Sequence, residues 1–185
     1  MSIVSEFLLE SVSIKQRLSE DSEFLSTWND AATALKSVVG NDGCIYICGN
    51  GGSACDAMHF REELVARYKR ERKGIRANHL ADSSTITCWS NDYGYDGVFT
   101  REIDTFVKSN DCLVAISTSG NSKNVIQGVL RAKELGAVTI GLLGKEGGEL
   151  KELVDFALVV PSSETDRIQE VHITLIHAFC EFLET

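Results

Sequence analysis

The sequence of 185 residues contains a single proline, Pro161, and no segment of low complexity. Such stretches commonly mark a linker, so their absence favours one domain over residues 1–185. No apolar run approaches the ~20 residues that a membrane helix needs, and the mean hydropathy is -0.04. The first ten residues have no basic segment and carry two acids, which argues against a secretory signal. The chain is therefore expected to be globular and to make no use of a membrane.

Basic residues are also scarce: 18 Lys and Arg stand against 27 Asp and Glu, giving a net charge of -9. An acidic chain repels the phosphate backbone, so no nucleic-acid partner is expected. None of the six cysteines forms a C-x-x-C pair, and Cys44, Cys48 and Cys112 lie within apolar runs. The six cysteines are therefore expected to be buried free thiols in a reducing compartment, the cytoplasm.

The order of apolar patterns predicts the fold. Residues 1–40 show the period of two helices, and Gly40 is a natural helix end. Short apolar runs then alternate with helical patterns, which is typical of a buried parallel sheet. We expect an α/β fold of three layers, with a parallel five-stranded sheet, helices on both faces and two leading helices. The expected strands are 44–48, 75–80 (the weakest), 113–116, 138–143 and 156–160; the expected helices are 54–68, 84–107 (one or two pieces), 122–135 and 165–183.

Two polar turns follow strands of this sheet. Glycines at 49, 51 and 52 precede a helix, where free N–H groups could cradle an anion; alternatively, a sharp turn needs glycine for its geometry alone. The residues Ser117-Thr118-Ser119-Gly120-Asn121-Ser122 precede another helix. Capping and a local turn would explain one or two of these four hydroxyls. Because the carboxyl ends of parallel strands share one edge, the two turns could converge on one ligand.

Acid–base side chains occur on two of the helices. His59 and Glu63 share one helix face at i, i+4 spacing, which suits a metal or a substrate but is also common as a surface contact. The last helix carries Gln169, His172 and His177, and we expect His172 to be an ordinary core histidine. Aldose–ketose isomerisation needs a base, a second proton carrier and a group that stabilises the enediolate. Glu63 and His177 have the chemistry for the first two roles.

A set of four side chains offers the nitrogen and oxygen ligands that suit zinc: His59, Glu63, Gln169 and His177. However, Gln169 and His177 lie about 12 Å apart along one helix. Both would have to stretch to share a metal, so one of them could come from a neighbouring subunit. This spacing predicts a site at a subunit interface.

Two further segments leave alternatives open. The basic run 67–73 is expected to end a helix with favourable cations and continue as a solvated loop, while Arg67 could reach a substrate phosphate. Asn91 and Asp92 precede an apparent turn, where Asp92 could bind sugar hydroxyls or cap the next helix.

The ordered motifs resemble a known family. The relevant segments are CGNGGS at 48–53, DAMHF at 56–60, EEL at 62–64, NDYG at 91–94, ISTSGNS at 116–122, GKEGG at 144–148, TDRIQE at 165–170 and His177. Together they resemble the sedoheptulose 7-phosphate isomerase (phosphoheptose isomerase) family, a branch of the SIS, or sugar isomerase, domain proteins with a flavodoxin- or Rossmann-like core. The resemblance runs from about Cys44 to the end of the chain.

The resemblance implies specific roles. It implies conversion of sedoheptulose 7-phosphate into D-glycero-D-manno-heptose 7-phosphate, one zinc ion per subunit, and a homotetramer with active sites between subunits, packed through residues 1–40. Glu63 and His177 would be the acid–base pair, and the zinc ligands would be the four side chains named above. Substrate contacts would come from Asn50, Gly51, Gly52, Ser53, Glu63, Asn91, Asp92, Ser117, Thr118, Ser119, Ser122 and Gln169. The product would supply heptose for lipopolysaccharide or capsule.

Two alternatives remain at this point. SIS domains can bind sugar phosphates without turnover, and a relative of the family is a tetrameric partner of the bacterial replication initiator. A pure binder, however, has no need for the complete set of acid–base and ligand side chains. An isomerase of a different sugar phosphate in capsule synthesis is the other alternative, and the sequence separates it poorly from the first.

Overall fold

A parallel five-stranded sheet forms the centre of the protein. The computed structural model describes residues 2–80 and 82–185. The strands lie in the order β2-β1-β3-β4-β5, and every neighbouring pair is parallel. In the register, Ile45 lies opposite both Ala77 and Cys112. The bounds are β1 Ile45–Gly49, β2 Ala77–His79, β3 Cys112–Ser117, β4 Val138–Gly144 and β5 Phe156–Val160.

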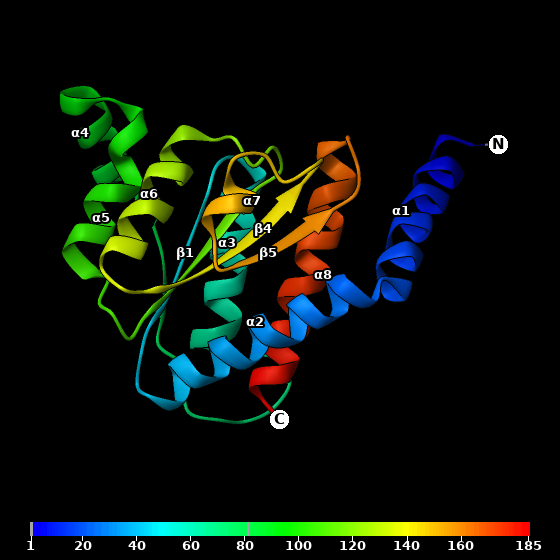
Figure 1. Cartoon of the computed structure of the whole chain (residues 1–185), viewed down its shortest axis with the longest axis horizontal. Helices are drawn as coiled ribbons and strands as arrows, with labels where there is room; N and C mark the ends of the chain where they lie inside the picture. The colour runs from blue at the N-terminus through cyan, green and yellow to red at the C-terminus, as the bar shows by residue number, and fades with distance from the viewer. Residues whose placement is uncertain (1, 81) are drawn as a thin grey trace.

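Helices cover both faces of this sheet (Figure 1). One face packs against α2, α3 and α8, and the opposite face packs against α4 to α7. The α-helices are α1 Ile3–Glu20, α2 Ser22–Gly40, α3 Gly52–Val65, α4 Ser83–Tyr93, α5 Val98–Phe106, α6 Lys123–Glu134, α7 Leu150–Leu153 and α8 Thr165–Leu183; a short 3-10 helix, η1, spans Tyr95–Gly97. The predicted three-layer α/β fold is confirmed.

Alternate side chains of each strand build two separate cores. Ile45 and Ile47 of β1 face the core that contains Phe60 of α3. Tyr46, between them, faces the other core together with Phe99 of α5. Because both faces of the strand are buried, its sequence is continuously apolar, which is why it could be recognised as a strand of a parallel sheet.

Several element bounds differ from the prediction. Helix α3 begins at Gly52 and ends at Val65, before the basic run. The segment expected as one or two helices over 84–107 forms three elements, because Gly94 adopts φ +92° between α4 and η1. Such a left-handed value is accessible to glycine and ends a helix. The one-turn helix α7 was not predicted.

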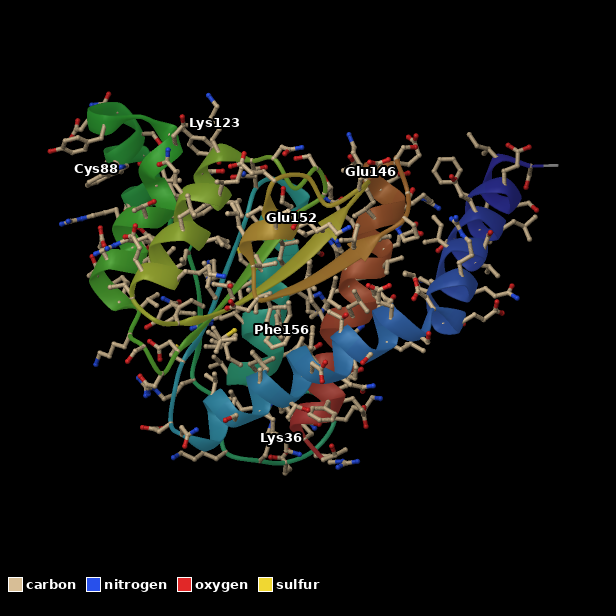
Figure 2. All side chains as sticks on the ribbon, viewed as in Figure 1. Lys36, Cys88, Lys123, Glu146, Glu152 and Phe156 are labelled. Atoms are coloured by element: carbon tan, nitrogen blue, oxygen red, sulfur yellow. The ribbon has the colours of Figure 1, made fainter. Side chains whose placement is uncertain are left out.

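The cysteine prediction is partly wrong. All six cysteines are free, but Cys55 and Cys88 are exposed, whereas the other four are buried. Cys88 lies on α4 at the periphery of the molecule (Figure 2). Its helix has no fully buried residue among those described, so this thiol does not contribute to a core.

Helix α1 extends beside the domain instead of covering it (Figure 1). Only Ile14 and Leu18 of α1 are buried, while Ile3 is 70% and Leu8 62% exposed. Among the residues that the structure describes, no helix combines the length and apolarity needed to cross a bilayer.

Candidate active site

The first polar turn joins β1 to α3 at the carboxyl edge of the sheet. Gly51 adopts φ +57° and precedes α3 without any side-chain cap on the helix. A Cβ atom on Gly52 would overlap the side-chain amide of Gln169, which reaches over from α8. Gly52 is therefore required for a close approach between the start of α3 and Gln169, in addition to the backbone freedom that Gly51 supplies.

The second polar turn joins β3 to α6, and its hydroxyls differ in their roles. Ser117 Oγ accepts the N–H of Gly120 at 3.1 Å and contacts Ser122 Oγ at 3.2 Å. Ser119 Oγ accepts the N–H of Asn121 at 3.2 Å. Ser122 stands at the N-cap of α6, yet its side chain makes no capping bond. Local bonds within the turn therefore involve Ser117, Ser119 and, through Ser117, Ser122, but none of them uses the hydroxyl of Thr118.

The two turns lie side by side, as predicted. Asn50 and Asn124 exchange amide hydrogen bonds, each 2.9 Å long, and the Tyr95 hydroxyl donates to Asn50 Oδ1 at 2.7 Å. Asn124 is 3% exposed. Sequence reasoning missed Asn124 and Tyr95, although Asn124 stands only two residues after the serine-rich segment. Asn50 thus joins the two turns through its whole amide group.

A cluster of acid–base side chains lies further along α3 and α8. His59 Nε2 is 3.2 Å from Glu63 Oε1. The ring of His177 lies 5.3 Å from the ring of His59 in an edge-on arrangement. Ligand atoms of these three residues all lie within 4.8 Å of one another. Glu63, from the first third of the chain, and His177, from the last helix, are thus direct neighbours.

The His59, Glu63 and His177 cluster fits a metal ion of the zinc type. Zinc binds imidazole nitrogen and carboxylate oxygen at about 2.0–2.2 Å, and catalytic sites commonly use three protein ligands and leave one position open. Two imidazoles and one carboxylate that converge within 4.8 Å meet this requirement. The side chain of His59 is 42% and that of Glu63 15% exposed, so solvent and ligands can reach the cluster.

Gln169 lies with the first turn. Its amide packs against Gly52, and His59 stands seven residues further along α3, about 10 Å along the helix axis. His172, between Gln169 and His177, is fully buried, and Leu143 O lies 3.0 Å from its Nε2. Burial lowers the pKa of His172 to about 4. His172 is therefore a core histidine, as expected, but it is only half satisfied, because among the described residues its Nδ1 has no hydrogen-bond partner.

Asp56 is a further polar residue on the same face of α3. It lies between Gly52 and His59 at helical spacing. Among the described residues, its Oδ2 has no hydrogen-bond partner. Burial raises the pKa of Asp56, and His59 partly opposes this shift. Sequence reasoning did not select it, although an acid one turn before His59 is a usable signal.

The two ambiguous segments are now resolved in part. Asn91 and Asp92 lie in the last turn of α4, where Asn91 Nδ2 donates to Asp92 Oδ1 at 2.8 Å. Asp92 therefore does not cap the next helix, since Gly94 precedes η1 and Gly97 precedes α5.

The basic run is only partly a solvated loop. Arg67 is exposed and lies 3.7 Å from Glu71. Arg72, in contrast, donates to the backbone carbonyls of Glu63 and Leu64 at 2.8 Å each, so a cation does bind the end of α3. The expectation of a solvated loop is wrong for Arg72, whose side chain is 15% exposed.

The parallel sheet with polar turns at its carboxyl edge and an adjoining His–Glu–His cluster defines a domain of the sugar isomerase class. The SIS domain family matches this chain over residues 7–144. A phosphoheptose isomerase of Helicobacter pylori (strain P12) is 47% identical over 183 residues, 98% of this chain and 94% of the relative. A phosphoheptose isomerase of Fusobacterium nucleatum is 40% identical over 184 residues, 100% of this chain and 94% of the relative.

Solved structures agree with these relatives. The structure of phosphoheptose isomerase GmhA from Neisseria gonorrhoeae has a TM-score of 0.91 and 39% identity, with coverage of 98% of this chain and 96% of that one. A phosphoheptose isomerase from Francisella tularensis has a TM-score of 0.92 and 31% identity, covering 97% and 95%. The chain belongs to the SIS domain family and, within it, to the phosphoheptose isomerases, which places it among the aldose–ketose isomerases.

Proposed function

We propose that the protein converts sedoheptulose 7-phosphate into D-glycero-D-manno-heptose 7-phosphate by proton transfer through an enediolate. The observation that carries this proposal is the meeting of Glu63 with His177 beside His59, within 4.8 Å. Its relatives are named phosphoheptose isomerases, which supports a heptose phosphate as the substrate. We also propose that it works in the cytoplasm, the reducing compartment that its cysteine pattern predicts.

Two side chains would carry the protons. Conversion of a ketose into an aldose moves a proton from C1 to C2 and shifts protons between the two oxygens. Glu63 would take the carbon-bound proton and return it to the adjacent carbon. His177, an imidazole with two ring nitrogens that can carry a proton, would serve the oxygens. Neither group then needs to leave the reacting end of the sugar.

We further propose that one zinc ion per subunit is held by His59, Glu63, Gln169 and His177. A bound zinc ion would act as a Lewis acid that stabilises negative charge on the enediolate oxygens. A carboxylate has two oxygens, so Glu63 can offer one to a metal while the other accepts a proton. The amide of Gln169 lies against Gly52 and not beside the His59, Glu63 and His177 of its own chain. Gln169 can therefore belong to this set only if it binds the zinc ion of a neighbouring subunit.

The polar turns would bind the phosphate and the hydroxyls. Helices α3 and α6 both begin without a side-chain cap, which favours an anion near their first N–H groups. The substrate contacts proposed here are those named from the sequence: Asn50, Gly51, Gly52, Ser53, Glu63, Asn91, Asp92, Ser117, Thr118, Ser119, Ser122 and Gln169.

Distances along α3 support a site shared between subunits. Glu63 stands eleven residues after Gly52, about 16 Å along the helix axis. An extended chain gains about 1.2 Å per bond, so C1 and the phosphorus of a heptose 7-phosphate are at most about 10 Å apart. A phosphate in the turns of one chain therefore leaves C1 short of Glu63 in that same chain. The cluster of a second subunit could supply the missing groups.

The exposed apolar face of α1 supports the same assembly. Ile3, Leu8 and Val12 are each more than half exposed. An apolar helix face of this size is typical of an interface between protein chains. We propose a homotetramer that packs through residues 1–40.

The function is tested by incubating the purified protein and zinc with sedoheptulose 7-phosphate and following the aldose product by NMR. Glu63→Gln should lower kcat at least ~100-fold. Glu62→Gln is the matched control, because Glu62 is exposed on the same helix turn. Absence of turnover by the wild-type protein would favour a sugar-phosphate binder, and a near-normal rate in Glu63→Gln would remove Glu63 from its role.

The shared site is tested by mixing subunits. Glu63→Gln disables the cluster, and Gly52→Ala disturbs the first turn through Gln169. If each site combines the turns of one chain with the cluster of another, hybrids of the two impaired variants should be more active than either variant alone. Hybrids without any gain would place the complete site within one chain.

A further inference from the structure

The C-terminal ends of α3 and α8 hold the two proposed acid–base residues. Glu63 lies two residues before the end of α3, and His177 lies in the second half of α8. Rotation or slippage at either end would change the distance between the carboxylate and the imidazole. What ties these helix ends together is therefore relevant to the chemistry.

A single buried carboxylate, that of Glu184, organises this region. It follows α8 directly, and its side chain is 1% exposed. Glu184 Oε1 accepts the N–H of Tyr68 at 3.1 Å, and Oε2 accepts the N–H groups of Lys69 and Arg70 at 3.0 Å each. Burial alone would raise the pKa of Glu184, but these backbone hydrogen bonds outweigh it and the pKa is lowered. The carboxylate is therefore ionised at neutral pH, and both of its oxygens accept hydrogen bonds.

Arg72 extends this contact to α3. Its Nε donates to Glu184 Oε1 at 3.1 Å. Its two terminal nitrogens donate to the carbonyls of Leu64 and Glu63, both at 2.8 Å. One guanidinium thus bridges the residue after α8 and the backbone of Glu63 itself. A planar group with several fixed donors is suited to this bridge, whereas a lysine would supply a single point of charge.

Tyr68 extends the contact to the other proposed catalytic group. Its N–H is held by Glu184, and its ring stacks on the ring of His177 at 5.7 Å with an interplanar angle of 20°. The same carboxylate therefore fixes a residue that packs on His177 and, through Arg72, the backbone of Glu63.

We propose that Glu184 is a positioning residue: through Arg72 and Tyr68 it sets the distance and orientation between Glu63 and His177. The inference rests on the roles proposed above for these two residues. It also predicts an effect on metal binding, since His59 and Glu63 come from α3 and His177 from α8. A salt bridge that only held the chain end would affect stability and nothing else.

The test compares Glu184→Gln with Glu181→Gln. Glu181 also lies at the end of α8 and pairs with Lys69 at 2.6 Å, but its side chain is 40% exposed, and Arg72 pairs with Glu184 instead. For the folded Glu184→Gln protein, kcat should fall roughly 10- to 100-fold, because displacements of about 1 Å have effects of this size. KM should change less than about 3-fold, since the phosphate-binding turns lie at the opposite end of α3. Glu181→Gln should keep both constants.

A second measurement does not depend on turnover. Zinc affinity, measured by competition with a chromophoric chelator, should fall at least ~10-fold in Glu184→Gln and remain unchanged in Glu181→Gln. Arg72→Lys should reproduce the loss, and the double variant should be no worse than either single one, because both changes break one bridge. If the wild type binds zinc but does not convert heptose phosphate, the proposed function fails while this readout still tests the positioning.

Two results would overturn the inference. One is a Glu184→Gln protein with a lowered melting temperature but wild-type kcat and zinc affinity, which would show a purely structural bond. The other is an equal loss in Glu181→Gln, which would assign the effect to the general charge of the helix end.

Discussion

Glu102 provides a sharp test of the electrostatics of this fold away from the proposed active site. Glu102 lies on α5 and is 7% exposed, and among the described residues its Oε2 has no hydrogen-bond partner. It lines a cavity of about 410 Å³ together with Asp82 and Arg101. Burial, with a smaller contribution from the charge of Asp82, raises the pKa of Glu102 from 4.5 to about 7.

The sign and size of the effect follow from this pKa. In the unfolded chain the carboxyl loses its proton near pH 4.5, whereas in the folded protein it keeps it until about pH 7. Stability that is fully present below pH 4.5 is thus lost as the pH rises to about 7. The difference corresponds to at most about 3 kcal/mol. Glu102→Gln keeps the shape and removes the charge, so the variant should be more stable than wild type at pH 8 and equal to it near pH 4.5.

The measurement is urea unfolding of both proteins at pH 4 and pH 8, compared at equal m-values. Glu152→Gln is the control, because Glu152 is exposed on α7 (Figure 2). Its free energy of unfolding should respond to pH as wild type does. The reasoning is refuted if Glu102→Gln gains nothing at pH 8, or if its gain is the same at both pH values, since ionisation would then not be the cause.

Four further changes have defined outcomes. Gly52→Ala should lower kcat/KM at least ~10-fold by displacing the Gln169 amide, yet leave thermal unfolding nearly unchanged because the overlapping atoms end a flexible side chain; normal kinetics would show that the amide position is unimportant. Removal of zinc by a chelator should abolish most turnover, and His59→Ala should lower zinc affinity at least ~10-fold in a competition assay; unchanged affinity would remove His59 from the ligand set. Asp21→Ala should lower the free energy of unfolding by about 1 kcal/mol in urea, because Asp21 accepts the N–H groups of Glu23 and Phe24 in the first turn of α2 at 3.0 Å each; no loss would mean that water replaces the cap.

The strands could be predicted from the sequence because burial on both faces leaves a local signature. The runs 44–48 and 156–160 match β1 and β5 within one residue. The ends of the helices were harder to predict, since they depend on the conformation of single residues. Gly94 breaks the segment after α4 through its positive φ, and an isolated glycine in a polar helical pattern does not reveal this conformation in advance.

The candidate site was likewise only partly predictable from the sequence. Its chemistry could be selected from residue type and helical spacing, whereas the pairing of Glu63 with His177 rested on their chemistry and on the family resemblance. The supporting contacts could not be selected in this way. Asn50 meets Asn124 across 74 positions, and Tyr68 meets Glu184 across 116. Such pairs carry no local pattern, because the backbone path that joins them is set by the whole sheet.

Helix α3 also determines where substrate selectivity can reside. Its start, at Gly52, serves the phosphate side of the proposed site, and Glu63 serves the reacting end. The rise of a helix is fixed, so no side-chain substitution brings these two points closer within one chain. If the reacting groups come from a second subunit, the usable length of the sugar is set by how the subunits dock. Discrimination between sugar phosphates of different chain length should then respond to changes in the packing of α1 more than to changes in the serines of the β3–α6 turn.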